Sequence, residues 1–132
     1  RPDNRVEYDI WYSSSNDVAL DFIQDFMKVD KRFGDNVLMT PGLFFGSVTI
    51  VMTVLESAFF GGGNYCATDS GNTKLTGQEI VLEDLRQMCI YKKAYSKDIT
   101  RQLYWDYIKT VHMECDNKLN EDCSKYAHKE IK

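Results

Sequence analysis

The sequence lacks an excess of positive charge, and it lacks the short motifs that mark common hydrolases. Its 16 lysine and arginine residues are outnumbered by 20 aspartate and glutamate residues, which gives a net charge of −4. No basic stripe is present, so nucleic acid is not an expected partner. The serine-hydrolase elbow, the zinc-protease helix motif and the calcium-loop pattern are missing, so we assign no catalytic residue, no metal and no cofactor.

A hydrophobic run long enough to cross a membrane is also missing. The most apolar stretch, residues 43–60, contains Glu56, and its non-ionic part, residues 42–55, is only 14 residues long. A membrane-spanning helix needs about 20 apolar residues. We therefore predict one or two buried strands here, because Val48–Val51 is rich in β-branched residues. Without an initiator methionine or a signal peptide, residues 1–132 are expected to be a single domain from a longer, processed protein.

Cysteine is sparse, but the placement of the four cysteines indicates disulfides. Cys66 closes a glycine-rich loop, Cys89 ends an amphipathic segment, and Cys115 and Cys123 flank a short polar linker. Four cysteines allow three connectivities. We favour Cys66 with Cys89 and Cys115 with Cys123, because the other connectivities join more distant elements. Two disulfides indicate an oxidising compartment, which is the secretory pathway lumen or the cell exterior.

A zinc site is the alternative use of two of these cysteines. His112, Cys115, Cys123 and His128 supply two nitrogen and two sulfur ligands, which is a common zinc set. His112 and Cys115 share one helix face, whereas Cys123 and His128 are five residues apart and lie on different faces. The spacing therefore favours the disulfide over the metal.

Alternation of apolar and polar residues predicts a small sheet. Residues 6–12 alternate and then become aromatic, which is typical of a strand, and residues 36–40 predict a second strand that Pro41 ends. The predicted elements follow the order of an α/β or α+β domain, which is strand, helix, strand, buried strands and then helices.

Helical spacing predicts four helices. They begin at Val18, at a capping box in residues 76–79, near residue 100 and after Asn120, and Gly34 is a typical residue after a helix end. The acids Glu83 and Asp84 are expected on a solvated face. The residues expected to face inward are Ala19, Phe22, Ile23, Phe26, Phe33, Val81, Leu85, Met88, Cys89, Leu103, Tyr104, Tyr107, Ile108, Val111, Cys115, Cys123, Tyr126, Ala127 and Ile131.

The first predicted strand runs into a loop that has no thiol. Residues 13–17 read Ser-Ser-Ser-Asn-Asp, a polar run typical of helix caps. Thiol–disulfide exchange needs a thiolate, and a helix N-terminus lowers the pKa of a thiol placed there. We therefore expect no exchange chemistry at this loop, and a thiol oxidoreductase is the hypothesis that the residues favour least.

Five segments, in order over most of the chain, resemble those of one known family. They are Arg5–Trp11, Gly62–Asp69, Leu85–Lys92, Tyr104–Tyr107 and the Cys115…Cys123 pair. Together they resemble the central luminal domain of vacuolar sorting receptors. The resemblance implies a thioredoxin-like α/β domain, a small sheet with flanking helices stapled by disulfides. It also implies a type I membrane protein that faces the secretory lumen and helps to bind cargo propeptides.

The chain departs from this family in two places. Residues 13–17 hold no thiol, and residues 42–60 hold none of the cysteines that the family carries there. Any function tied to those cysteines is therefore not carried over. We also carry over no cargo-binding residue, because that role belongs largely to a neighbouring domain of such receptors.

Two non-enzymatic functions follow as hypotheses. The first is a luminal or extracellular scaffold or recognition domain of a receptor-like protein, with a cargo peptide or neighbouring domains as its partner. The second is a structural subunit of an extracellular or cell-surface assembly, in which residues 44–60 form an interface. Trp105 lies one step off the inward stripe, and we weigh a partner-facing role for it against packing in the core. The candidate interface residues are Trp105, Phe44, Phe45, Phe59 and Phe60.

Overall fold

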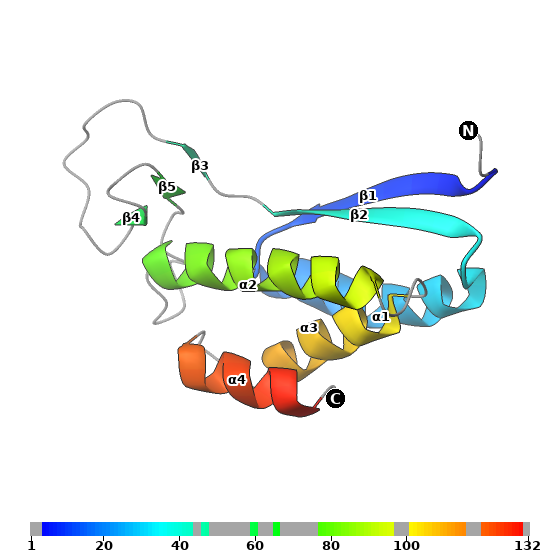
Figure 1. Ribbon diagram of the computed structural model, residues 1–132. Helices are drawn as coiled ribbons and strands as arrows, with labels where there is room; N and C mark the ends of the chain where they lie inside the picture. The colour runs from blue at the N-terminus through cyan, green and yellow to red at the C-terminus, as the bar shows by residue number, and fades with distance from the viewer. Residues whose placement is uncertain are drawn as a thin grey trace.

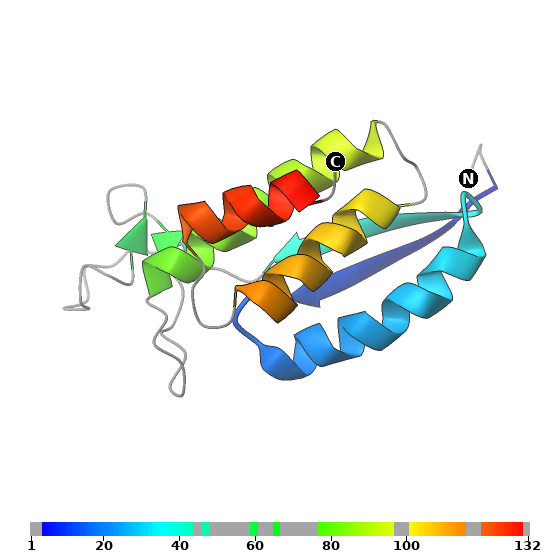
Figure 2. The same ribbon diagram turned by 90° about the horizontal axis from the view of Figure 1, so that it is seen from below.

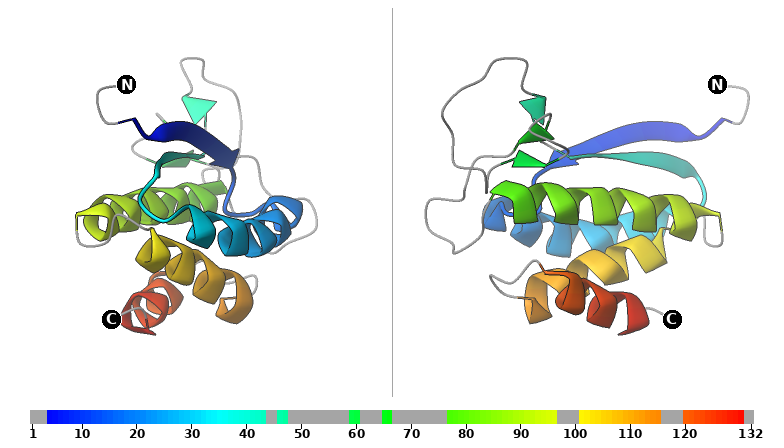
Figure 3. Two further views of the ribbon diagram at one scale, coloured as in Figure 1. Left: turned by 90° about the vertical axis from the view of Figure 1, so that its right-hand side faces the viewer. Right: turned by 60° about the vertical axis from the view of Figure 1, so that its left-hand side comes forward.

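The computed structural model describes residues 4–43, 46–47, 59–60, 65–66, 77–96, 101–115 and 120–130. The elements of this part, in chain order, are β1 (Val6–Tyr12), α1 (Asp17–Phe33), β2 (Val37–Leu43), β3 (Gly46–Ser47), β4 (Phe59–Phe60), β5 (Tyr65–Cys66), α2 (Gly77–Tyr95), α3 (Gln102–Glu114) and α4 (Glu121–Glu130). These helices all lie on one side of the sheet that β1 and β2 form (Figure 1, Figure 3).

Strands β1 and β2 are parallel, and α1 connects them. Their register pairs Val6 with Val37 and runs without a break to Tyr12 and Leu43. The prediction that Pro41 ends the second strand is wrong, because Pro41 lies inside β2 in a trans peptide bond. Proline lacks an N–H group and is tolerated at the edge of a sheet. Among the strands described, β2 pairs with β1 alone, so the missing N–H is consistent with this position.

The ends of α1 are set by the residues that the sequence indicated. The Asn16 side chain accepts a hydrogen bond from the backbone N–H of Ala19 at 3.0 Å, which caps the first turn. At the other end Gly34 has a φ of 57°, which lies in the left-handed region that glycine adopts most easily. Helix α1 therefore begins directly after the loop that follows β1.

Helix α3 lies at the centre of the helical layer and contacts α1, α2 and α4 (Figure 2). Tyr104, Tyr107, Ile108 and Val111 are buried, as predicted. The inward positions predicted for Phe22, Phe33, Cys89 and Tyr126 are wrong, because all four are exposed. On α1 Ile23 is buried as predicted, and Leu20 and Asp30 are buried as well, whereas Phe22 and Phe33 lie away from the packed side.

The apolar stretch of residues 43–60 lies mostly outside the described residues, and so does the prediction of buried strands there. At its two ends the backbone of β3 and of β4 pairs antiparallel with β5. None of the helices that the structure describes combines the length and the apolar character that a membrane span requires.

Candidate functional site

The loop between β1 and α1 is fastened by hydrogen bonds of its serines. The Oγ atoms of Ser13 and Ser15 lie 3.0 Å apart. Ser14 is buried, its N–H donates to Asp84 Oδ1 at 3.1 Å, and its Oγ–H donates to the Ile80 carbonyl at 3.4 Å. The loop is therefore attached to α2 by Ser14. Hydroxyl groups occupy the place at which a redox dithiol would need thiols.

Two adjacent carboxyl groups are buried beneath this loop. Glu83 and Asp84 are 1% and 0% exposed, so the prediction of a solvated face is wrong. Burial raises the pKa of Asp84 to about 7; hydrogen bonds from Ser14 oppose the rise, and the charge of Glu83 adds to it. Burial also raises the pKa of Glu83, against hydrogen bonds from Gln87 and the charge of Arg86. Within the described residues, Asp84 Oδ2 has no hydrogen-bond partner.

Donors from several elements explain why these acids are tolerated inside. Tyr107 Oη donates to Glu83 Oε1 at 3.1 Å, and Gln87 Nε2 donates to the same atom at 3.2 Å. Tyr12 Oη donates to Gln87 Oε1 at 2.6 Å and lies 2.6 Å from Tyr104 Oη. A network of buried hydroxyl, amide and carboxyl groups thus joins β1, α2 and α3. Burial raises the pKa of Tyr12 and Tyr104, so their hydroxyls stay protonated at neutral pH.

A second buried polar cluster holds Trp105. The indole Nε1–H donates to Asp30 Oδ2 at 2.7 Å, and Arg101 Nε donates to the same oxygen at 3.0 Å. Tyr8 donates its hydroxyl hydrogen to the other oxygen of Asp30. Trp105 is 2% exposed, so the prediction that it faces a partner is wrong and the core alternative is correct. A tryptophan is well placed inside when its N–H finds an acceptor.

The cysteines agree with one predicted disulfide only. Cys115 and Cys123 form a disulfide with a Cα–Cα distance of 5.8 Å, which joins the end of α3 to α4 and uses both sulfur atoms of the alternative zinc set. Cys89 is a free, exposed cysteine, so the predicted Cys66–Cys89 bond is not formed. The strand β5, which contains Cys66, lies beside the first part of α2 (Figure 1). Cys89 lies 12 residues after Gly77, the first residue of α2, which is about 18 Å along the helix and well beyond the span of a disulfide.

The side chains of the other predicted interface residues lie outside the described part of the structure. Phe44 and Phe45 are not among the described residues, and Phe59 and Phe60 are placed by their backbone alone, as β4. Their role remains a prediction. In the described parts of the chain, no group of three or more His, Cys, Asp and Glu side chains is arranged to hold a metal ion.

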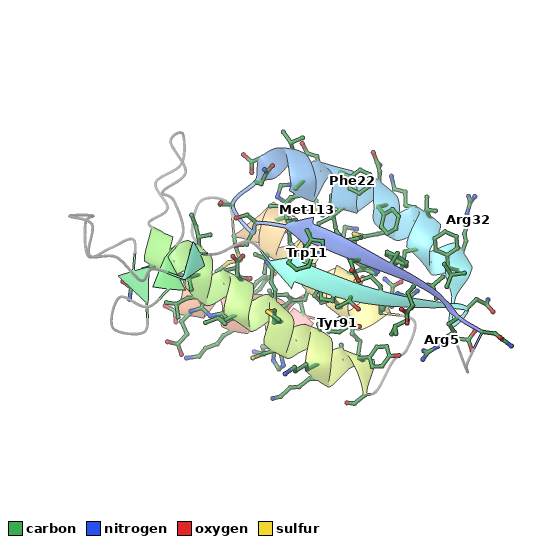
Figure 4. The ribbon with its side chains drawn as sticks, turned by 90° about the horizontal axis from the view of Figure 1, so that it is seen from above. Arg5, Trp11, Phe22, Arg32, Tyr91 and Met113 are labelled. Carbon is green, nitrogen blue, oxygen red and sulfur yellow. A yellow bond between two sulfur atoms is a disulfide. The ribbon has the colours of Figure 1, made fainter. Side chains whose placement is uncertain are left out.

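Several large apolar side chains are exposed at positions that sequence reasoning did not identify as exposed. Trp11 is 62% exposed at the end of β1, where its ring covers Gly42 so closely that any Cβ there would lie 2.3 Å from the ring (Figure 4). The number of apolar residues in α1 was a usable signal, because they are too many for one packed stripe. The exposed apolar residues nearest to Trp11 in the sequence are Val6, Val18, Phe22, Val29 and Phe33.

Comparisons with known proteins agree on one family. Residues 6–132 match the vacuolar sorting receptor thioredoxin-like domain. Vacuolar-sorting receptor 1 of Pisum sativum is 28% identical over 147 aligned residues, which cover 98% of this chain and 23% of that protein. Vacuolar-sorting receptor 4 of Arabidopsis thaliana is 27% identical over 148, with the same two coverages. The chain thus spans less than a quarter of the length of these relatives. No solved structure gives a significant match.

Proposed function

Because this chain belongs to the vacuolar sorting receptor thioredoxin-like domain family, we propose that it is a non-enzymatic scaffold or recognition domain of such a receptor. Its partners in this role are proteins, either cargo peptides or neighbouring receptor domains. Its place of action is the lumen of the secretory pathway. The Cys115–Cys123 disulfide is consistent with an oxidising lumen.

The serine loop between β1 and α1 is the observation that carries the non-enzymatic part of this proposal. Exchange chemistry needs a thiolate, and a helix N-terminus is a place that lowers the pKa of a thiol. This loop offers hydroxyl groups instead, and Ser14 is committed to Asp84 and Ile80. The disulfide lies at the junction of α3 and α4, and Cys89 lies on the exposed side of α2. Neither the Cys115–Cys123 disulfide nor the Cys89 thiol lies at this loop, which supports a binding role in place of a redox role.

A chimeric receptor tests the proposal. Residues 6–132 replace the matching segment of a vacuolar-sorting receptor, and the fraction of a vacuolar cargo protein that cells secrete is measured. A receptor without the segment is the reference. We expect the chimera to retain cargo, and the same chimera with Cys89→Ser to retain it equally, because no thiol chemistry is required. Secretion at the level of the deletion, with the chimera present at normal abundance and folded, contradicts the proposal.

A structural subunit of an extracellular assembly is the second candidate function. The observation that favours it is the group of exposed apolar side chains on α1 (Val18, Phe22, Val29 and Phe33), because exposed apolar patches mark contacts with other proteins. Full retention of cargo by the chimera would favour the receptor role over this one.

A further inference from the structure

An exposed row of apolar side chains runs along the outer side of α1. Val18, Phe22, Val29 and Phe33 are spaced by four, seven and four residues, which places them on one side of a helix. They are 81%, 59%, 45% and 39% exposed. Phe22 stacks on Phe26 with ring centroids 5.7 Å apart, and Phe26 contacts Trp105 edge-on at 6.3 Å. Phe22 is therefore held in place by aromatic contacts that reach into the core.

A row of charged side chains runs beside the apolar row. Asp21, Asp25, Lys28 and Arg32 are spaced by four, three and four residues, and all are exposed. Asp25 pairs with Lys28 at 2.8 Å, and Asp21 lies 3.2 Å from His112 Nε2. Exposed pairs of this kind contribute little to stability, so they leave these charges available to another partner. The first half of the row is acidic and the second half is basic.

Each row is complementary to the same row of a second α1 helix that runs in the opposite direction. The midpoint of the apolar row lies between Asp25 and Phe26, half a residue from the middle of α1. Phe22 and Val29 lie equally far from this midpoint, and so do Val18 and Phe33. When a second α1 lies antiparallel, aromatic residues meet valines along the whole row. The acidic half of each charged row then lies beside the basic half of the other. A surface that matches itself after a half-turn is the requirement for a two-fold symmetric dimer.

We propose that α1 is a self-association surface, at which two copies of this chain pack their α1 helices antiparallel about a two-fold axis. The helix lies at one edge of the domain, with α2 at the opposite edge, so a second copy reaches it without meeting α2 (Figure 2). Phe22 and Arg32 lie on this edge, and Arg32 points away from the domain (Figure 4). This inference concerns association of the chain with itself, so it stands apart from the proposed receptor function.

The contact between two α1 helices is small. A helix of 17 residues is about 25 Å long, and one pair of such helices buries an area in the smallest class of specific interfaces, below about 1,200 Å². Interfaces of this class are weak and transient. The dimer is therefore expected only at high protein concentration, or when the protein is held at a surface that raises its local concentration.

Sedimentation equilibrium of the 132-residue chain over a concentration series tests the proposal. The average mass is expected to rise from 15.3 kDa toward twice that value as concentration increases. Phe22→Glu is expected to weaken association by about tenfold or more, because it places a charge at the centre of the contact. Tyr126→Glu is the matched control: it changes another half-exposed aromatic residue, on α4, and is expected to leave the association unchanged.

Charge reversal separates the proposal from loss of folding. One variant carries Asp21→Lys and Asp25→Lys, and the other carries Lys28→Glu and Arg32→Glu. Each alone is expected to stay monomeric, because like charges then face each other, while an equimolar mixture regains the dimer. Thermal melts confirm that both variants are folded. A wild-type chain that stays at 15.3 kDa at every concentration, or two folded variants that fail to associate when mixed, overturns the proposal.

Discussion

The buried carboxyl group of Asp84 predicts an unusual dependence of stability on pH. Burial raises its pKa from 3.8 to about 7, so the folded chain holds this proton more tightly than the unfolded chain does. The contribution of Asp84 to the free energy of unfolding is then fully present below about pH 4, is lost as the pH rises to about 7, and changes little above that. At about 1.4 kcal/mol for each pKa unit, the fall amounts to about 4 kcal/mol. Glu83 contributes in the same direction, because burial raises its pKa as well.

Asp84→Asn is the variant that isolates this effect. Asparagine keeps an oxygen that accepts the hydrogen bond from the Ser14 N–H, and it carries no charge to desolvate. Urea unfolding followed by circular dichroism gives the free energy of unfolding at each pH from 4 to 8. We expect the variant to be close to the wild type at pH 4 and more stable by several kcal/mol at pH 8.

The control for this experiment is Asp122→Asn, on the exposed side of α4. Its profile is expected to run parallel to that of the wild type across the whole pH range. If the profile of Asp84→Asn is also parallel to the wild type, the carboxyl group of Asp84 does not hold a raised pKa and the reasoning is refuted.

Three further predictions concern the contacts that hold the helices. Replacing Cys115 and Cys123 by alanine removes a disulfide across eight residues and is expected to lower the free energy of unfolding by about 2.5 kcal/mol, as measured by urea unfolding. Arg101→Met leaves Asp30 buried without its cation; a loss of about 3–5 kcal/mol is expected, and a loss below 1 kcal/mol would contradict a buried ion pair. Tyr107→Phe removes a hydroxyl that donates to a buried carboxylate, and thermal melting should show a lower midpoint than the wild type, whereas an unchanged midpoint would contradict the contact.

Periodicity and capping residues could be predicted because they depend on local chemistry. The strand over residues 6–12 follows from the alternation of its side chains. The cap at Asn16 follows from its side-chain oxygen, which accepts a hydrogen bond, and the cap at Gly34 follows from the positive φ that glycine adopts easily. The Cys115–Cys123 disulfide could also be predicted, since a short polar linker brings the two helix ends together. In each case the residues that determine the structure lie close together in the sequence.

The buried polar groups could not be predicted, because their partners are far away in the sequence. Glu83 is buried with Tyr107, and Asp84 is buried with Ser14, from elements that the sequence does not place beside α2. The choice between the two positions of Trp105 could not be made for the same reason, since its acceptor Asp30 is 75 residues away. The exposed row on α1 was missed because spacing identifies an apolar side of a helix but does not show whether another element covers it.

Reduction of insulin by dithiothreitol in the presence of the 132-residue chain tests most directly whether this domain works without thiol chemistry. A dithiol oxidoreductase serves as the positive control, and the readout is the initial rate of precipitation of the reduced insulin chains. The serine loop predicts that the chain leaves this rate at the value for dithiothreitol alone. A rate that rises in proportion to the concentration of the chain, and that Cys89→Ser abolishes, would contradict the account, because the exposed thiol would then be a catalytic group.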